Sequence, residues 1–262
     1  MDFKLTEDQE MVRNSVREFA ENEIAPLARE YDEEEKFPKA QLEALAEMGL
    51  LGMIIPEEYG GTGFDSVSYS LALEEIARAD ASVAVIVGVT NSVCCYPIFC
   101  FGTEEQKQKF LVPLATGKEL GAFCLSEPQA GSDAMNLKTR AELDGDEYII
   151  NGTKSWVTNG GESDTHIVMA VTGENNGKKE VSAFIVEKER GGLSVSSVEH
   201  KLGQRASRTT ELSFADVRVS KENLLGEIGA GMKVAFNSLD NGRIGIGSLS
   251  VGIAQAAFGE AL

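Results

Sequence analysis

The spacing of apolar and polar residues divides the chain into three parts. Over residues 1–117 apolar side chains recur at helical spacing, as at Val12 and Val16, which predicts a helical domain. Residues 118–223 form short apolar or alternating runs between turns, and predict a middle β-barrel or sandwich domain. Helical spacing returns over 224–262, which predicts a further helix after the β-domain. The pattern therefore predicts a multidomain α+β fold.

Capping residues indicate where several helices begin. Thr6 with Gln9, and Thr103 with Gln106, have the spacing of a capping box, in which each side chain bonds the backbone N–H of the other residue. Ser66 is the expected N-cap of a further helix. These positions predict three helix starts in the N-terminal domain.

Proline and glycine mark expected breaks between these helices. Pro26 should end or kink the first helix, Pro38 should open the second, and Gly49 should end it. The acidic run 32–35 is expected to be a solvated connection, and residues 56–61 are expected to form a loop.

The segment 81–101 is nearly all apolar, and its length suits a central buried helix. Its Val and Ile residues between 83 and 87 would also suit a strand, so the pattern leaves both structures open. The longest apolar run, 81–89, is far shorter than the roughly 20 residues that span a bilayer, and no membrane segment is expected. Pro113 and Gly117 should close the helical domain.

Short strands between turns define the middle domain. Asp144-Gly145 lies between two runs of strand-like sequence and is a strong hairpin signal. The expected strands are 137–143, 148–150, 166–171, 181–186, 193–198 and 210–214. Their number and even spacing favour a barrel or a sandwich.

The last predicted helix contains four glycines, at positions 242, 245, 247 and 252. Each costs about 1 kcal/mol of helix stability relative to alanine, so close packing or a ligand should compensate. This helix reaches Leu262 without a stop signal, and no later element would cover its apolar face. We therefore expect the chain to lack a C-terminal part.

The charge of the chain narrows the choice of partners. It has 24 basic and 42 acidic residues, a formal net charge of -18. This excess disfavours a surface that binds nucleic acid or an anionic membrane. It permits a basic protein partner, but a solvated acidic surface is the simpler interpretation.

The cysteines and histidines show no metal-ligand or redox spacing. Cys94, Cys95, Cys100 and Cys124 lack a C-x-x-C pattern, and are expected to be buried free thiols in a reducing compartment. His166 and His200 are isolated and are expected to be structural, so no metal site is predicted. The N-terminus lacks the pattern of a signal or transit peptide.

Two stretches combine strand-like sequence with polar or glycine-rich turns: 121–133 (GAFCLSEPQAGSD) and 154–161 (KSWVTNGG). The first places hydroxyls and open backbone after an apolar strand. In the second, Trp156 and Thr158 should face the same side of a strand. A large ring beside hydroxyls and free amides suits a flat heteroaromatic ligand with polar edges.

These stretches, together with LDNGRIGIG at 239–247, resemble the acyl-CoA dehydrogenase family, nearest its short-chain (butyryl-CoA) members. The resemblance covers essentially the whole chain, with three motifs in the expected order. It implies a helical domain, a β-domain and a helical bundle with FAD at their junction. It also implies α,β-desaturation of a short or medium acyl-CoA to the trans-2-enoyl-CoA, with electrons passing to an electron-transfer flavoprotein.

The resemblance further implies a homotetramer, which would lie in the bacterial cytoplasm or, for a mature eukaryotic protein, in the mitochondrial matrix. It places the Leu125 backbone and the Ser126 hydroxyl at the pyrimidine end of the flavin, Thr158 beside N5, and Trp156 on the ring. The implied cofactor-binding residues are Phe123, Leu125, Ser126, Gly131, Ser132, Trp156, Val157 and Thr158.

The implied substrate-binding residues are Ser132, Phe236, Asp240, Asn241, Gly242 and Arg243. Arg243 would support the region of the catalytic base and could pair with Asp240. Some family members carry the base, a glutamate, where this chain has Gly242, and others carry it well past position 262. No catalytic base is therefore expected in this chain, and Glu127 is expected to support structure.

Two departures from the family pattern concern the site. Ser126 replaces the more usual threonine and keeps the hydroxyl, whereas Asn241 stands where close relatives often have glycine. Other functions also stay open: a truncated module that binds flavin or CoA without catalysis, a flavin-dependent enoyl-CoA reductase, or an acyl-CoA oxidase. The sequence does not fix the acyl chain length.

Overall fold

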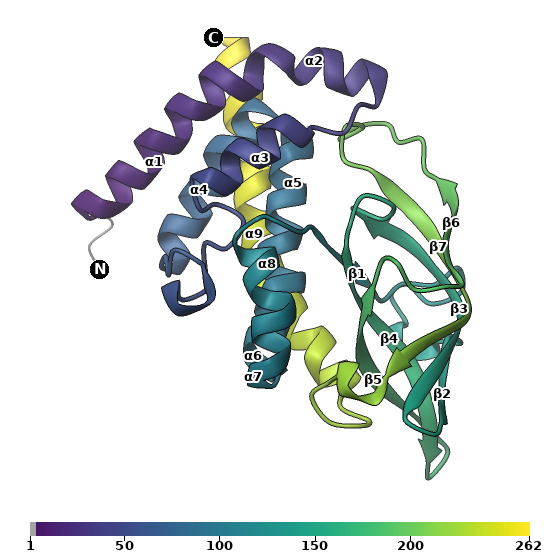
Figure 1. Cartoon of the computed structure of the whole chain (residues 1–262). Coiled ribbons are helices and arrows are strands. Elements are labelled where there is room, and N and C mark those ends of the chain that lie inside the picture. The colour runs from purple at the N-terminus through teal and green to yellow at the C-terminus, as the bar shows by residue number, and fades with distance from the viewer. Residues whose placement is uncertain (1–3) are drawn as a thin grey trace.

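The computed structural model describes residues 4–262 and places a layer of helices beside a curled β-sheet (Figure 1). The helices are α1 (Glu7–Phe19), α2 (Ala25–Glu34), α3 (Lys39–Glu47), α4 (Ser66–Ala79), α5 (Ala81–Val89), α6 (Tyr96–Phe101), α7 (Glu104–Gln106), α8 (Val112–Ala115) and α9 (Gly231–Ala261). The long helix α9, yellow-green to yellow in Figure 1, starts near β5 and runs through the helical layer. This arrangement confirms the predicted fold class, whereas the domain limits stay predictions.

Both predicted capping boxes are present. Gln9 N–H donates to the Thr6 hydroxyl at 3.2 Å, and Gln106 N–H donates to that of Thr103 at the same distance. The third cap was placed one residue too late. Asp65, not Ser66, is the N-cap of α4, because its carboxylate accepts from the backbone N–H of Ser68 at 2.7 Å.

Pro26 does not end the first helical run, whereas α8 closes between Pro113 and Gly117 as predicted, since this helix ends at Ala115 and Gly117 has a φ of +69°. A π-helical turn, Ala20–Ile24, joins α1 to α2, and Pro26 stands in the first turn of α2, where a missing N–H costs little. Pro113 occupies the same position in α8, after a π-helical turn at Lys107–Leu111. The expectation at Gly49 is confirmed, since this residue follows α3 with a φ of +75°.

The acidic run 32–35 is not the expected solvated connection. Asp32 lies in the last turn of α2, and its carboxylate accepts from the backbone N–H of Arg205 at 3.0 Å. Glu35 ends this helix and pairs with Arg205 at 3.0 Å and with His200 at 2.8 Å. These carboxylates therefore tie the helical layer to the loop between β6 (Leu193–Val198) and β7 (Thr209–Ser220).

The apolar segment Ala81–Phe101 is helical throughout, as α5, a π-helical turn at Thr90–Cys95, and α6. Among residues 4–262 it is the one helix long and apolar enough to cross a membrane, with a mean hydropathy of 1.9. However, 72% of its most apolar 18-residue stretch is buried inside the protein, as in the core helix of a folded domain. The ambiguity between helix and strand is thus resolved in favour of a buried helix.

Three of the four cysteines are buried free thiols as expected, but Cys100 is exposed. It lies in the last turn of α6, two residues after the buried Ile98, and so falls on the outer side of that helix.

In residues 4–262 the sheet has eight strands, of which seven follow the order β6-β7-β3-β2-β4-β5-β8 and the eighth, β1, pairs in parallel with β4. The strands are β1 (Gly121–Cys124), β2 (Arg140–Asp144), β3 (Glu147–Thr158), β4 (Thr165–Asn175), β5 (Lys178–Glu187), β6 (Leu193–Val198), β7 (Thr209–Ser220) and β8 (Leu224–Leu225). The predicted hairpin is confirmed as β2–β3, and its turn contains Gly145 with a φ of +64°.

Side chains on β4 alternate between two cores. Ile167 and Met169 pack against the helical layer, whereas Val168 and Ala170 pack inside the curled sheet. This double burial explains why β4 is a continuous apolar run. It also places the sheet flat against the helices, so that the ends of β1 and β3 can face α5 and α9.

Close packing compensates for the helix stability that two of the four glycines in α9 cost. A Cβ atom on Gly245 would lie 2.5 Å from the Tyr69 hydroxyl oxygen, and one on Gly252 would lie 2.3 Å from the Glu74 carbonyl oxygen. A Cβ on Gly242 would make an ordinary contact of 3.5 Å with the Ser92 hydroxyl, and one on Gly247 would face open space. The glycines at 245 and 252 therefore let α9 approach α4 closely.

We expect Gly252→Ala to lower the free energy of unfolding by about 1–3 kcal/mol. The added methyl would meet backbone of α4, and the strain should exceed the roughly 1 kcal/mol that alanine gains in helix propensity. Gly247→Ala is the matched control and should be neutral or stabilising, because nothing lies near its Cβ. Urea unfolding followed by circular dichroism measures both, and equal stabilities would contradict the expectation.

Candidate functional site

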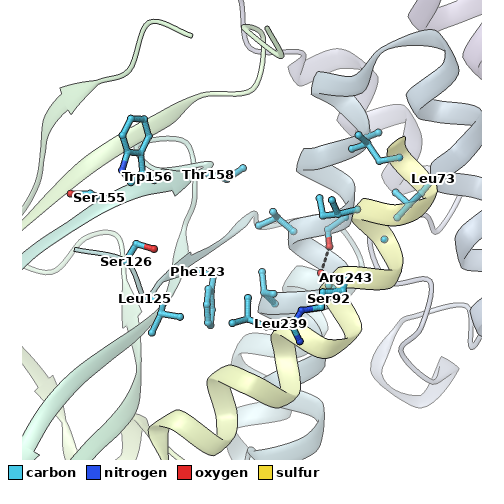
Figure 2. Close-up of a pocket in the computed structure, with 18 residues that line it drawn as sticks. Leu73, Ser92, Phe123, Leu125, Ser126, Ser155, Trp156, Thr158, Leu239 and Arg243 are labelled. Carbon is cyan, nitrogen blue, oxygen red and sulfur yellow. Dashed lines mark hydrogen bonds between the residues drawn. The ribbon is translucent and has the colours of Figure 1, made fainter. Parts of the chain in front are cut away.

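A cavity of about 400 Å³ lies between the sheet and the helical layer (Figure 2). Its sheet wall is formed by Phe123, Leu125, Ser126, Ser155, Trp156 and Thr158. Its helical wall is formed by Leu73, Ala84, Gly88, Val89, Ser92, Val93, Leu239, Gly242, Arg243, Gly245, Ile246 and Leu249. The first wall supplies most of the hydroxyls and the second is largely apolar, so the cavity has a polar side and an apolar side.

A β-bulge shapes the sheet wall. The pairing of β3 with β7 gains one residue between Lys154 and Val157, and Trp156 has a φ of +59°. As a result both Ser155 and Trp156 line the cavity, together with Thr158, while Lys154 and Val157 are buried on the other side. The predicted common side of Trp156 and Thr158 agrees with the cavity, but simple alternation would have placed Ser155 away from it.

Several polar groups on this wall have no protein partner. Among residues 4–262, the Ser126 N–H, the Ser126 hydroxyl, the Thr158 hydroxyl and the Trp156 indole N–H form no hydrogen bond. In Figure 2 Ser126, Trp156 and Thr158 stand on the same wall of the cavity, with Phe123 and Leu125 below them. Unpartnered donors and acceptors next to apolar side chains suit a flat ligand with polar edges.

A buried ion pair lies behind this wall. Lys154 Nζ donates to Glu127 Oε1 at 2.8 Å and to the Leu125 carbonyl at 3.1 Å, and both charged side chains are almost fully buried. Burial alone would raise the pKa of Glu127, but the Lys154 ammonium and hydrogen bonds from Lys138 and Thr139 lower it to about 2. A carboxylate held this way supports the loop and is unsuited to act as a base at neutral pH.

The helical wall receives only part of the predicted substrate-binding set. Gly242 and Arg243 line the cavity, whereas Phe236, Asp240 and Asn241 do not. Arg243 forms the predicted ion pair with Asp240, but their side chains are 68% and 72% exposed, so the pair adds little stability. The positions of α9 that do face the cavity follow a helical stripe that includes Leu239 and Leu249.

Three predicted cofactor-binding residues also lie off the cavity. Gly131 and Ser132 are exposed in the loop after β1, and the Val157 side chain is buried inside the sheet. No aspartate or glutamate is among the described residues that line the cavity, and Arg243 is its one charged residue. The residues that line the cavity therefore offer hydroxyls, an indole and a guanidinium, and no carboxylate.

Comparisons with known proteins agree with this geometry. Family models match the chain at residues 6–118, the acyl-CoA dehydrogenase N-terminal domain, and at residues 122–217, the acyl-CoA dehydrogenase middle domain. The short-chain-specific acyl-CoA dehydrogenase of Clostridium acetobutylicum is 49% identical over 261 residues, which are 100% of this chain and 69% of that protein. The mouse mitochondrial short-chain-specific enzyme is 48% identical over 97% of this chain and 62% of its own length.

Solved structures give the same result. Butyryl-CoA dehydrogenase from Megasphaera elsdenii superposes with a TM-score of 0.96 at 44% identity, covering 100% of this chain and 69% of that one. A chain in the structure of the electron transferring flavoprotein of Acidaminococcus fermentans gives 0.95 at 46% identity, covering 98% and 68%. An acyl-CoA dehydrogenase from Bacillus anthracis complexed with FAD gives 0.88 at 42% identity, covering 95% and 42%. The chain therefore belongs to the acyl-CoA dehydrogenase family of FAD-dependent oxidoreductases.

Proposed function

We propose that this chain forms the flavin- and acyl-binding part of a short-chain acyl-CoA dehydrogenase, which converts a short acyl-CoA to the trans-2-enoyl-CoA. The observation that carries the proposal is the two-sided cavity, with unpartnered polar groups after β1 and on β3 facing an apolar wall from α4, α5 and α9. Short-chain and butyryl-CoA enzymes among the relatives support the same substrate class.

The residues present fit an isoalloxazine ring. Ser126 and Thr158 offer hydroxyls, and the Ser126 N–H offers a free donor, for the polar edges of the ring. Trp156 stands at the mouth with 64% of its surface exposed, where its indole would cover the ring. Bound FAD would supply the acceptor to which the β-hydrogen of the substrate is transferred as a hydride. The protein would hold the ring, satisfy its polar edges and keep water away.

The apolar side of the cavity fits a short acyl chain. Leu73, Ala84 and Gly88 close its end, and Leu249 packs beside them. These side chains exclude water from the carbons that react, which strengthens every electrostatic contact made there. Because Tyr69 and Leu73 fill the space beyond Gly245, we propose that the substrate is short rather than long.

The lack of a carboxylate at the cavity favours a second candidate for the chain by itself. Without a base, the cavity would bind flavin and acyl-CoA but would not remove the α-proton of the substrate. In the complete enzyme a carboxylate from outside the described residues would supply that step. The two candidates differ in catalysis and not in binding.

The test is to purify the chain with FAD and add butyryl-CoA without oxygen. A dehydrogenase turns yellow with FAD and is bleached as the ring is reduced, and 2-butenoyl-CoA accumulates. A binding module turns yellow and shows a spectral shift without bleaching. A chain that takes up no FAD would refute the proposed site. Re-oxidation of the bleached enzyme by oxygen would identify an oxidase instead.

We propose that electrons leave through an electron-transfer flavoprotein and that the complete enzyme is a homotetramer. The similarity to a chain from a structure of electron transferring flavoprotein supports the first proposal. Relatives include proteins from bacteria and mitochondrial enzymes from mammals. We therefore propose the bacterial cytoplasm or the mitochondrial matrix as the location.

We expect Gly88→Ala to weaken hexanoyl-CoA binding relative to butyryl-CoA binding. A Cβ at position 88 would make an ordinary 3.7 Å contact with Leu73, so the protein should fold, but the methyl would occupy the end of the cavity. The expected change in relative affinity is about 1–2 kcal/mol, the scale of one methylene in an apolar pocket. Spectral titration of the FAD-loaded protein measures it, with Gly247→Ala as control, and an unchanged ratio would show that the acyl chain lies elsewhere.

A further inference from the structure

The strongest feature outside the cavity itself is the lysine directly behind its sheet wall. The Lys154 side chain is fully buried, and its ammonium makes two contacts. It donates to the Leu125 carbonyl oxygen at 3.1 Å and to Glu127 Oε1 at 2.8 Å. Both contacts lie in the short segment that follows β1, which carries the polar edge of the cavity.

The negative end of this ion pair is compensated from other directions. The Glu127 carboxylate also accepts from the backbone N–H groups of Lys138 at 2.7 Å and Thr139 at 3.1 Å, and from the side-chain amide of Gln129 at 2.6 Å. Within residues 4–262, the Lys154 ammonium is the one group seen to donate a hydrogen bond to the Leu125 carbonyl. The ammonium therefore acts on the Leu125 carbonyl as a positive charge in a region of low dielectric.

The effect on the cavity follows from the geometry of one peptide group. The peptide bonds of the described residues are all trans, so the N–H of Ser126 points opposite to the Leu125 carbonyl, away from Lys154. Ser126 lines the cavity, and among residues 4–262 its N–H has no protein acceptor. The next carbonyl, that of Ser126, is fixed by Ser155 N–H at 2.9 Å, which holds the segment in register with β3.

We infer that Lys154 is a positioning residue that orients and polarises the Leu125–Ser126 peptide, so that the Ser126 N–H favours the electron-rich, reduced form of a ring bound in the cavity. A charge behind the carbonyl makes the opposite N–H a stronger donor, because hydrogen bonds in a chain polarise one another. Reduction adds electron density to the polar edge of a flavin, where such a donor stabilises it. The inference rests on the proposed function in that the ring is taken to be FAD.

The first experiment compares the midpoint potential of FAD bound to wild type, Lys154→Arg and the double variant Lys154→Met with Glu127→Gln. The double variant removes both buried charges together, and so avoids an unpaired carboxylate. It should bind oxidised FAD within about threefold of wild type but reduced FAD about tenfold more weakly, which lowers the potential by about 30 mV. Lys154→Arg keeps the charge and should restore the wild-type potential. An unchanged potential in the double variant would overturn the inference.

The single variant Glu127→Gln distinguishes two explanations: that the Lys154 ammonium polarises the peptide, or that the ion pair only holds the segment in place. It leaves Lys154 beside the Leu125 carbonyl, so at pH 6 the preference for reduced FAD should stay within about threefold of wild type. A tenfold loss in this variant as well would overturn the inference, since the pair and not the ammonium would then matter. If the double variant does not fold, a tenfold loss in Glu127→Gln would still overturn the inference.

A measurement on flavin-free protein keeps this inference distinct from the proposed function. With ¹⁵N-labelled serine, the Ser126 amide proton should shift upfield in the double variant and stay in place in Lys154→Arg, because only the first removes the charge. If wild type takes up no FAD, the proposed function fails while this shift still tests the polarised peptide. No shift in the folded double variant would refute the role of Lys154.

Discussion

Lys154→Met is expected to lower the free energy of unfolding by about 3–5 kcal/mol, the usual cost of removing one partner from a buried ion pair. The substitution would leave the Glu127 carboxylate buried without its ammonium, although three other donors still reach it. It would also free the Leu125 carbonyl, and so loosen the segment that forms the cavity wall. Urea unfolding at pH 7 with and without FAD measures both effects.

The control for this prediction is the double variant that also carries Glu127→Gln. Because it contains neither charge, it should recover most of the lost stability, as neutral replacements of buried pairs often do. A single variant as stable as wild type would show that the carboxylate reaches water after Lys154 is lost. A double variant as unstable as the single one would attribute the loss to packing of the lysine stem.

The elements that the sequence predicts well are those with local causes. A capping box needs two residues three positions apart, and both boxes, at Thr6 and Thr103, are present in the structure. The β2–β3 hairpin follows from the turn at Gly145 in the same way. The order of the helical and β parts follows from the change in apolar spacing along the chain, and the family motifs add the cofactor.

The features that the sequence missed depend on contacts between distant segments. The π-helical turn before Pro26 joins α1 to α2 without a break in the helical chain. No local sequence rule distinguishes this outcome from a helix end. Asp32 and Glu35 look like solvated charges until the loop that carries Arg205 packs against them. Their partners are more than 150 positions away along the chain, too far for any spacing rule to find.

In the candidate site, too, the residues with local sequence signals were predicted and those placed by distant contacts were not. Phe123, Leu125 and Ser126 follow from a strand that ends in a polar turn, and the cavity contains all three. Ser155 was missed because the bulge beside Trp156 breaks the alternation of β3, and its position depends on pairing with β7. On α9, Phe236 and Asp240 do not line the cavity, since packing of α9 against α4, which Gly245 allows, sets its rotation, and their role in substrate binding stays a prediction.

Acid is expected to destabilise the protein through His166 between about pH 6.5 and pH 4. This side chain is 2% exposed, its Nδ1 lies 3.1 Å from the Val186 carbonyl, and its Nε2 lies 2.9 Å from the Ser163 hydroxyl. Burial, with the nearby Lys188 ammonium, lowers its pKa from 6.5 to about 4 against the opposing effects of the Val186 carbonyl and Asp164. Between these two pH values the unfolded chain binds a proton that the folded chain does not, so stability falls as the pH falls.

The loss in the free energy of unfolding from protonation of His166 should total about 3 kcal/mol, because each unit of pKa shift contributes about 1.4 kcal/mol. His166→Gln, which cannot take up this proton, should remove that part of the loss between pH 7 and pH 4, whereas His200→Gln, at an exposed position, should not. Urea unfolding at a series of pH values gives both slopes. Because Glu127 has a lowered pKa of about 2, its own contribution is lost only as the pH falls from about 4.5 toward 2, and the two groups therefore separate along the pH axis. If the His166 variant kept the wild-type slope above pH 4.5, a group other than this imidazole would have to take up the proton.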